Sequence, residues 1–426
     1  MSHSNPSLWT QLPQSQQSPC DRYKHACCSY SGHVYVLGGR DSSGVGDFWK
    51  YSVVCDEWTE LNCTSDAAPE QLEEHSMVAH EGFLYVFGGR LDSAYSTCAG
   101  ALWVFNVAKQ KWVHCQEKRS SPQRPSNRKG HSAVVIGETM FIYGGFVDVK
   151  GPSQELWGLH FGTSGWSLLS HPDSSSPGPR HSHCAVAYRG SMFLFGGLKG
   201  LREQRDFWEW NSSSQTWTCL KTKSGPPRLM GHSAVVYRDS MLLFGGGETQ
   251  NFPQNRLWRY SFPTNTWTQV ASLTCSSPPD KIHHCCTGLG PSFTPTCCWS
   301  SSEPTQQDQK HRPFRNRCSP AAQVFLGSRC DIELKTFSQN IRLSSAELDQ
   351  TSGTGTCPQN RGTHLTCENQ ALKKQWSCTA EELLDQEEEE DEDICKHLPD
   401  LLLVLGGRPY SRNSPISVWQ MTLTDP

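Results

Sequence analysis

The stretch that decides the fold runs from His131 to Gly145 and reads His-Ser-Ala-Val-Val-Ile-Gly-Glu-Thr-Met-Phe-Ile-Tyr-Gly-Gly. Two short apolar runs flank a turn signal at Gly137-Glu138, which predicts a hairpin of two buried strands, called a and b here. The same histidine and glycine pair recur at the same spacing in four other places: His25 and Gly38, His75 and Gly88, His183 and Gly196, and His232 and Gly245. The chain therefore contains an internal repeat.

Two tryptophans follow each glycine pair, at a constant distance from each other. The pairs are Trp49 and Trp58, Trp103 and Trp112, Trp157 and Trp166, Trp208 and Trp217, and Trp258 and Trp267. The first Trp and the bulky residue two positions later lie on the same face of a strand c. Turn residues such as Asn211-Ser-Ser-Ser separate it from a strand d that holds the second Trp. Each copy therefore predicts a four-stranded antiparallel sheet, and radial stacking of the copies buries both faces.

Paired glycines after an apolar strand, followed by an aromatic residue and a spaced Trp, resemble the Kelch repeat. The resemblance covers about two thirds of the chain. Members of that family fold as β-propellers with one blade per repeat. The resemblance therefore implies an all-β, Kelch-type propeller whose blades carry the binding surface.

A sixth blade is split between the two ends of the chain. The segment 9–12 repeats the strand-d text of 58–61, while Leu401–Gly407 and the segment around Trp419 have the pattern of strands b and c. Strand a is expected at Cys285-Cys286, with His283 aligned to His25. Closing the ring in this way removes exposed sheet edges. The predicted architecture is a six-bladed propeller formed by residues 1–289 and 400–426.

Residues 290–399 interrupt the sixth blade between strands a and b. The segment is rich in Ser, Thr, Gln and Cys and ends in an acidic run from Asp385 to Asp393. Such a composition predicts a disordered insertion, with a short helix around Ala380–Glu390. Its place between strands a and b predicts that it leaves the ring on the face opposite the arginines described below.

Composition limits the kinds of partner and compartment. The formal net charge is −4, which favours neither nucleic acid nor a membrane as the partner. The segment 1–10 has no signal-peptide pattern, and no apolar run reaches the length of a membrane span. We therefore expect a protein of the cytoplasm or the nucleus, whose 20 cysteines are mostly reduced.

No pattern in the sequence predicts a catalytic residue, a cofactor or a metal site. The glycine pairs lack the context and the Lys of a phosphate-binding loop, and each strand-a histidine is expected to form a hydrogen bond within its own blade. The insertion has no CxxC pair. Iron-dependent plant specifier proteins, which have the same fold, use Glu, Asp and His spaced by four, but here Ser276 precedes Asp280 and His284. Six blades argue against a galactose oxidase site, so a metalloenzyme is the least favoured alternative.

The resemblance implies a peptide-binding face made by the d–a and b–c loops, with arginines before strand a and after the glycine pair. The matching positions are Arg22, Arg128, Arg180 and Arg228 before strand a, and Arg40, Arg90 and Arg408 after the glycines. Blade 2 departs from the pattern with Leu72-Glu73-Glu74. We expect a cationic rim around the axis that binds an acidic segment or a free carboxylate, since arginine pairs well with carboxylates. The alternative is a set of solvated loop cations.

Two functions of different kinds agree with this fold. The first is a non-enzymatic scaffold that binds a protein partner. The second is a substrate receptor of a cullin ubiquitin ligase, as many Kelch proteins are. A first strand at Trp9 leaves no room for an N-terminal BTB or F-box domain, and the only adaptor-like text is Leu326, Cys330 and Leu334 after Phe325, which resembles an Elongin-binding box.

Overall fold

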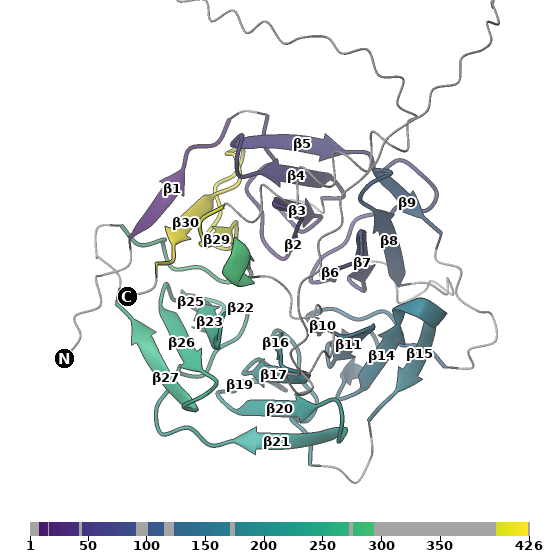
Figure 1. The fold of residues 1–426 in the computed structure, drawn as a ribbon, viewed down its shortest axis with the longest axis vertical. Coiled ribbons are helices and arrows are strands. Elements are labelled where there is room, and N and C mark those ends of the chain that lie inside the picture. The colour runs from purple at the N-terminus through teal and green to yellow at the C-terminus, as the bar shows by residue number, and fades with distance from the viewer. Residues whose placement is uncertain are drawn as a thin grey trace, which may run out of the picture. The chain divides into compact units, whose positions relative to one another are not determined.

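The computed structural model describes residues 8–15, 17–41, 45–90, 101–114, 123–170, 175–271, 276–293 and 398–424. All of these residues belong to one compact unit. They form six four-stranded antiparallel sheets arranged radially around an axis, as Figure 1 shows. The predicted fold class, a six-bladed propeller, is confirmed.

Blades 1 to 3 follow the chain order, with the first strand of each sheet nearest the axis (Figure 1). Blade 1 consists of β2 (Ala26–Tyr30), β3 (His33–Leu37), β4 (Phe48–Ser52) and β5 (Glu57–Leu61). Blade 2 consists of β6 (Ser76–His80), β7 (Phe83–Phe87), β8 (Leu102–Asn106) and β9 (Lys111–Val113). Blade 3 consists of β10 (Ser132–Ile136), β11 (Thr139–Tyr143), β14 (Leu156–His160) and β15 (Gly165–Leu168), with a 3-10 turn η1 (Phe161–Thr163) between the last two strands.

Blades 4 and 5 repeat this order. In the described part of the chain, blades 3, 4 and 5 carry an additional small hairpin between strands b and c. Blade 4 consists of β16 (Cys184–Tyr188), β17 (Ser191–Phe195), β20 (Phe207–Asn211) and β21 (Thr216–Leu220). Blade 5 consists of β22 (Ser233–Tyr237), β23 (Ser240–Phe244), β26 (Leu257–Ser261) and β27 (Thr266–Val270). The hairpins are β12 (Phe146–Val147) with β13 (Gly151–Pro152) on blade 3, β18 (Leu198–Lys199) with β19 (Arg202–Glu203) on blade 4, and β24 (Gly247–Thr249) with β25 (Phe252–Pro253) on blade 5.

Blade 6 is assembled from three separate parts of the chain. Its strands, from the axis outward, are β28 (Cys285–Leu289), β29 (Leu401–Leu405), β30 (Val418–Thr422) and β1 (Trp9–Leu12). Strand β1 pairs antiparallel with β30, with Trp9 opposite Met421. The N-terminal segment therefore closes the ring as strand d of the last blade.

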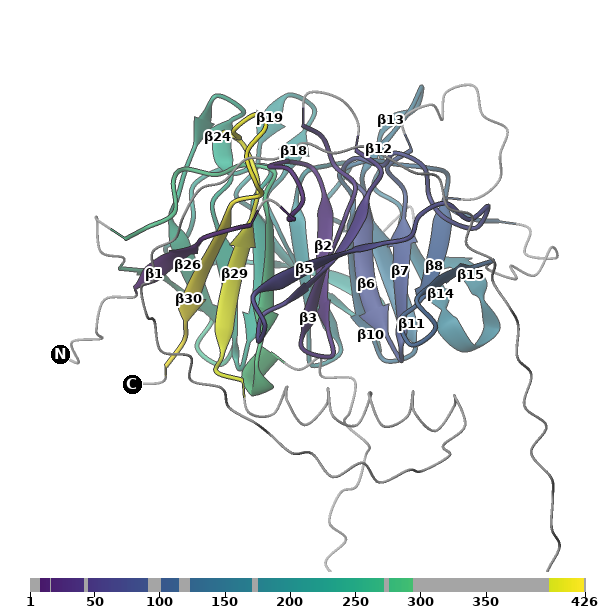
Figure 2. The ribbon, with the colours of Figure 1, turned by 90° about the horizontal axis from the view of Figure 1, so that it is seen from above.

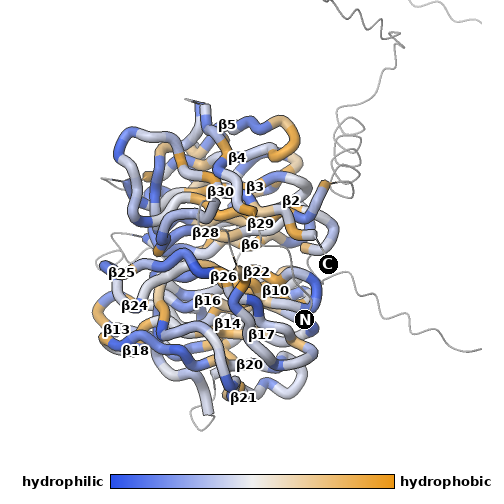
Figure 3. Tube along the Cα trace, turned by 90° about the vertical axis from the view of Figure 1, so that its left-hand side faces the viewer, coloured by the Kyte–Doolittle hydropathy of each residue, from blue (hydrophilic) through white to orange (hydrophobic). Residues whose placement is uncertain are grey.

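The core is divided among the junctions between neighbouring blades. Six clusters of buried apolar side chains are present in the described residues, one between each pair of adjacent blades. Leu401 to Leu405 of blade 6, for example, are buried at every position, and Figure 3 shows this apolar segment beside β28. Because both faces of each sheet are covered, no blade is stable alone.

Among the strand-c residues, the most deeply buried is the one two positions after the first Trp. Tyr51, Phe105, Leu159, Trp210 and Tyr260 are all 0–1% exposed. The first Trp is half-buried in five of the six blades and buried only at Trp157. The first Trp therefore lies at the edge of the core, where its indole N–H can donate a hydrogen bond.

The glycine pair and the strand-a histidines interlock. Gly39 has φ +97°, and a Cβ added there would lie 2.8 Å from the Cβ of His25 in the same blade. A Cβ on Gly38 would lie 3.2 Å from Cε1 of His75, in the next blade. Any side chain at these positions would separate strand a from its neighbours, so the glycines are required by packing.

Two residue alignments in the sequence differ from the structure by one position. Gly407 packs against Cβ of His284, and β28 begins at Cys285, so His284 is the strand-a histidine of blade 6 where His283 was expected. In blade 5 the residue that corresponds to Arg180 is Leu229, and Arg228 precedes it. The sequence alone does not settle the alignment here, because His283 is followed by a second histidine and Arg228 directly precedes the equivalent position.

The ends of the predicted insertion pack on blades 5 and 6. Residues 291–293 form a 3-10 turn, η2 (Pro291–Phe293), whose Phe293 ring lies 5.1 Å from that of Tyr237. Ser292 N–H donates to Asp400 Oδ1 at 2.9 Å, so the two ends meet. The propeller therefore extends through Phe293. The predictions of disorder and of a helix at 380–390 lie outside the described residues.

No helix in the described ranges has the length and apolar composition that a bilayer crossing requires.

Candidate partner-binding face

The loops after strands b and d lie on one face of the ring, which we call the Gly-Gly face. Figure 2 shows it at the top, marked by β12, β13, β18, β19 and β24. The a–b and c–d turns lie on the opposite face. All seven arginines predicted as a cationic rim belong to loops of the Gly-Gly face.

Three of the seven arginines do not present charge to solvent. Arg22, Arg128 and Arg180 are 0% exposed. The Arg180 guanidinium donates to both carboxylate oxygens of Asp206 at 2.8 Å and to the carbonyl of Gly196 at 2.8 Å. The prediction that these three arginines contact a partner is wrong, because a fully buried guanidinium satisfied by its own blade has no surface to offer.

Arg22 and Arg128 have the same environment as Arg180. Arg22 pairs with Asp47 and Arg128 with Glu155, each at 2.8 Å from one carboxylate oxygen, and both also donate to the carbonyl of the first glycine. The acid stands two residues before the first Trp of strand c, and that indole N–H is its second donor. The three Trp-to-acid distances are 2.6 Å for Trp49 and Asp47, 2.9 Å for Trp157 and Glu155, and 2.7 Å for Trp208 and Asp206.

These contacts change the acidity of the carboxylates. Burial would raise the pKa of Asp206, but hydrogen bonds from Arg180 and Trp208 and the Arg180 charge together lower it below its ordinary value. The pKa of Glu155 is lowered in the same way by Trp157 and Arg128, against the effect of burial. Asp206 and Glu155 are therefore ionised in the folded protein, and each balances the charge of its arginine.

The repeats contain a signal that could have revealed this pairing. Where the acid is absent, the arginine is absent too: blade 2 has Leu72 with Ala101, and blade 5 has Leu229 with Arg256. Both leucines are 1% exposed. In blade 6 Lys281, 3% exposed, donates instead to Ser417 Oγ at 3.1 Å. An arginine that appears only with an acid at a fixed position is a buried pair.

A closed ring of backbone hydrogen bonds forms the floor of the mouth. The residue before each strand-a histidine has positive φ, and its N–H donates to the carbonyl of the matching residue in the preceding blade at 2.7–2.9 Å. The six residues are Lys24, Glu74, Gly130, Ser182, Gly231 and His283. Lys24 and Glu74 form a salt bridge of 3.0 Å above this ring. Burial raises the pKa of Glu74, but Lys24 and His283 lower it more, so the mouth contains a fixed charge pair.

The other four arginines lie nearer the surface. Arg40 donates to Glu73 at 3.1 Å, and Lys129 Nζ lies 3.5 Å from the other oxygen of Glu73. Arg90 is half-buried, with its backbone bonded on both sides to the amide of Asn127. Arg228 is exposed.

Arg408 lies at the seam between blades 6 and 1. It is exposed, and its guanidinium lies 5.2 Å from the centre of the Tyr23 ring, which in turn lies 5.3 Å from that of Tyr410. This contact places a charged guanidinium beside two aromatic rings on the Gly-Gly face.

Apolar side chains at the hairpin tips are a second feature of the Gly-Gly face, and the sequence reasoning missed them. Leu201, Val149 and Phe252 are 97%, 95% and 71% exposed, the highest values among the large apolar residues described. They belong to the hairpins of three consecutive blades, 3 to 5. The sequence feature that could have indicated them is an apolar residue in the middle of the connection between strands b and c.

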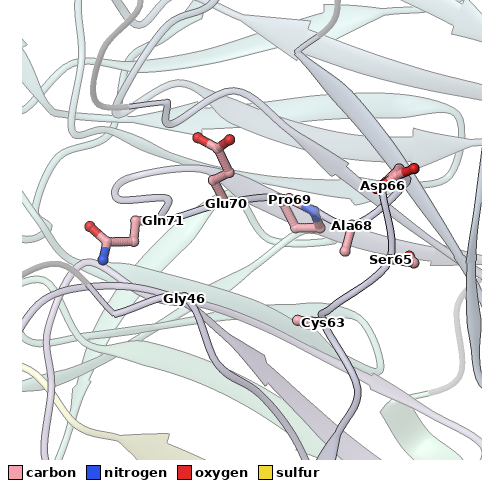
Figure 4. A pocket seen from close by; sticks show the side chains of 8 residues that line it. All are labelled: Gly46, Cys63, Ser65, Asp66, Ala68, Pro69, Glu70 and Gln71. Atoms are coloured by element: carbon pink, nitrogen blue, oxygen red, sulfur yellow. The ribbon is translucent and has the colours of Figure 1, made fainter.

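A hollow of about 980 Å³ lies beside the loop between β5 and β6. Gly46 and residues of the loop line it, as Figure 4 shows: Cys63, Ser65, Asp66, Ala68, Pro69, Glu70 and Gln71. Among the described residues that line it, the charged ones are Asp66 and Glu70. The predicted arginines take no part in it, so it is separate from the rim.

Three strand-a histidines, His131, His183 and His232, bond to the preceding blade, so for these three the expectation of a bond within one blade is wrong. Nε2 of His131 lies 2.8 Å from Ser76 Oγ, that of His183 2.9 Å from Ser132 Oγ, and that of His232 3.1 Å from the Phe195 carbonyl. Burial lowers the pKa of His131 to about 3 and that of His232 to about 4. His131 and His232 are therefore neutral, and each links its blade to the preceding one through a hydrogen bond. The Elongin-box prediction at 326–334 lies outside the described residues.

Comparison with known proteins gives one family and several relatives. A family model for the KLHDC2/KLHL20/DRC7 Kelch-repeats domain matches residues 2–125 and 74–293. The chain is 25% identical over 227 residues to Kelch domain-containing protein 10 of Xenopus laevis, covering 51% of this chain and 54% of that protein. It is 31% identical over 163 residues to Kelch domain-containing protein 3 of Bos taurus, covering 36% and 42%. The chain thus spans about half the length of these relatives.

A third relative has a different kind of name. The leucine-zipper-like transcriptional regulator 1 homolog of Drosophila melanogaster is 24% identical over 291 residues, which cover 65% of this chain and 29% of that protein. The similarity therefore leaves most of that longer protein unmatched.

Proposed function

Because this chain belongs to the Kelch-repeat family, we propose that its propeller is a non-enzymatic interaction module that binds a protein or peptide on the Gly-Gly face. One observation carries the proposal. The three most exposed large apolar side chains in the described residues, Val149, Leu201 and Phe252, all project from hairpins of that face. Exposed apolar residues grouped on one face are typical of a partner-binding surface.

The surface cations support a proposal about the chemistry of the partner. Arg408 over Tyr23 provides a cation beside aromatic rings, and Arg40 and Arg90 lie after the glycine pairs of blades 1 and 2. We propose that an acidic segment or a free carboxylate of the partner binds on this side of the mouth. Apolar residues of the same partner would contact the hairpin tips of blades 3 to 5.

The hairpin tips are tested by substitution in the full chain. Val149→Ser, Leu201→Ser and Phe252→Ser are combined, and the matched control is Val54→Ser, which is 57% exposed in a c–d turn of the opposite face. Proteins that co-purify with tagged chain from cells are quantified by mass spectrometry. We expect the triple variant to lose partners that Val54→Ser retains. The same partners at the same level on both variants would contradict the proposal.

The cation is tested by charge reversal. We expect Arg408→Glu to remove the same partners, with a change in the free energy of unfolding within about 0.5 kcal/mol. The control is Lys111→Glu, an exposed position on outer strand β9. Unchanged partner recovery with Arg408→Glu would limit the binding site to the hairpins. Elongin or a cullin among the proteins lost would identify the module as a substrate receptor.

A further inference from the structure

On the face opposite the Gly-Gly face, three blade junctions share one polar arrangement. At the junction of blades 4 and 5, the last residue of strand a, Tyr188, stacks on Phe262 at 3.8 Å between ring centres. Its hydroxyl donates to Asp239, in the a–b turn of the next blade. Arg189, the residue after Tyr188, lies 3.2 Å from the same carboxylate. An aromatic donor, an acid and a cation therefore make a charge-balanced group.

The junction of blades 5 and 6 repeats this group. Tyr237 donates to Asp400 at 3.4 Å, and Arg238, the next residue, lies 3.8 Å from that carboxylate. The arrangement is therefore a recurrent way of joining neighbouring blades.

The junction of blades 2 and 3 has side chains at the same three positions, but their charges differ. His80 holds the position of Tyr188 and stacks on Phe161 at 4.0 Å, as Tyr188 does on Phe262. Its Nε2 lies 3.3 Å from Glu138, which holds the position of Asp239. The third position, an arginine at the other two junctions, is Glu81, whose carboxylate lies 3.8 Å from the same nitrogen. Two carboxylates therefore surround one imidazole, and the cation of the other junctions is replaced by an acid.

The imidazole is positioned as a ligand. The His80 side chain is 4% exposed, and its Nε2 is buried with no hydrogen-bond partner among the described residues. Glu81 and Glu138 are 74% and 59% exposed. One donor atom from each of the three residues lies within 4.8 Å of the others. A tetrahedral zinc ion bonded to nitrogen and carboxylate oxygen at about 2.0–2.2 Å needs donors about 3.4 Å apart. The distances of 3.3 Å from His80 Nε2 to Glu138 and 3.8 Å to Glu81 are close to that separation.

We propose that His80, Glu81 and Glu138 bind a divalent first-row metal cation of the zinc class, which joins blade 2 to blade 3. A 2+ charge balances the two carboxylates, as Arg189 balances Asp239 at the junction of blades 4 and 5. Imidazole and carboxylate are the usual ligands of such ions. Three protein ligands leave coordination positions for water. The sequence predicts no metal site here because the ligands belong to different repeats.

Two variants convert this junction to the arrangement of blades 4 and 5, so that folding is retained. They are Glu81→Arg, which supplies the missing cation, and His80→Tyr, which supplies the aromatic donor. The matched control is Asp239→Asn, which removes the corresponding acid at the junction without the His. The 20 cysteines of the chain are common to all four proteins, so thiol-bound metal cancels in the comparison.

Zn²⁺ is titrated into each full-length, reduced protein by calorimetry, and Tm is measured with and without the ion. We expect wild type and Asp239→Asn to bind one more equivalent than the two junction variants, whose affinity at this site falls by about tenfold or more. Zn²⁺ should raise Tm only where the site is intact, because a ligand of the folded state stabilises it. Equal stoichiometry and equal Tm shifts in all four proteins would overturn the proposal and leave a His80–glutamate ion pair.

Discussion

At the scale of single residues, the arginines of the Gly-Gly face divide into two kinds that look alike in the sequence. Arg22, Arg128 and Arg180 are buried and neutralised, whereas Arg228 and Arg408 are exposed. A charge taken out of water must be paired and fully hydrogen-bonded. The acid two residues before the strand-c Trp satisfies that requirement in blades 1, 3 and 4.

Breaking one buried pair should be costly. Arg180→Leu leaves Asp206 without its guanidinium, and we expect the free energy of unfolding to fall by about 3 kcal/mol, measured by urea denaturation. The exposed control Arg228→Leu should change it by no more than about 0.5 kcal/mol.

The paired change should recover most of that loss. Arg180→Leu with Asp206→Ala reproduces the Leu72 and Ala101 combination that blade 2 already has. If the double variant is as unstable as Arg180→Leu alone, the loss of stability does not come from the unpaired Asp206. The apolar pair of blade 2 would then be no guide to blade 4.

Buried histidines should make the propeller sensitive to acid. Burial lowers the pKa of His75 and His131 to about 3 and of His283 to about 4, below the 6.5 of an exposed imidazole. The unfolded chain therefore binds more protons, and stability is full above pH 6.5 and declines as the pH falls toward 4. Each such histidine contributes about 1.4 kcal/mol per pH unit in that window.

Denaturation at pH 7 and pH 5 tests this dependence. We expect a lower free energy of unfolding at pH 5, and a shallower slope in His131→Gln, which takes up no proton. The exposed His114→Gln should keep the wild-type slope. Identical slopes in the two variants would show that His131 is not the titrating group.

At the scale of elements, the four-residue strand β1 contributes to stability in two ways. It supplies the outer strand of blade 6, and Trp9, 3% exposed, packs against Phe244 of blade 5 with ring centres 5.4 Å apart. One strand therefore serves both the pairing of blade 6 and the core between blades 5 and 6.

Removing residues 1–12 should destabilise the whole ring. The truncation removes the partner of the outer edge of β30, which stays paired with β29, and exposes the cluster around Phe244 and Met421. Burying a Trp of this kind is worth about 3–5 kcal/mol. We expect a lower Tm in calorimetry. The milder variant Trp9→Phe should retain part of the stability. A truncated protein that melts at the wild-type temperature would contradict the closure by β1.

At the scale of the whole molecule, the contacts that stabilise the propeller run from blade to blade around a closed ring. Each of the six core clusters lies between two blades, and the backbone hydrogen bonds at the mouth pass from blade to blade until they return to Lys24. A closed ring leaves no blade with an uncovered face, whereas an open one would expose an apolar sheet. Loss of one blade contact should therefore reduce the stability of all blades together.

The ring should tolerate replacement of residues 294–397 by a short Gly-Ser linker. The hydrogen bond between Ser292 and Asp400 brings the flanking ends together, and a tenfold change in loop length alters closure free energy by only about 2 kcal/mol. We expect unchanged far-UV circular dichroism and unchanged partner recovery. A replacement that begins at Gly290 removes Phe293 and should be less stable. Loss of folding in the first design would mean that 294–397 contributes to the core.

The sequence by itself determined the blades, their order and the way the ring closes, because these depend on local patterns. Alternating apolar residues define the strands. A glycine pair such as Gly38-Gly39 is required at each place where a strand-a histidine packs against the backbone. Only the tertiary structure decided which arginines are exposed, since Arg180 and Asp206 meet only after the blade has folded. The same holds for His80 and Glu138, which come from different blades. The repeats show that the arginine and the acid occur together, but burial depends on the neighbours that surround the pair in space, which the sequence pattern does not specify.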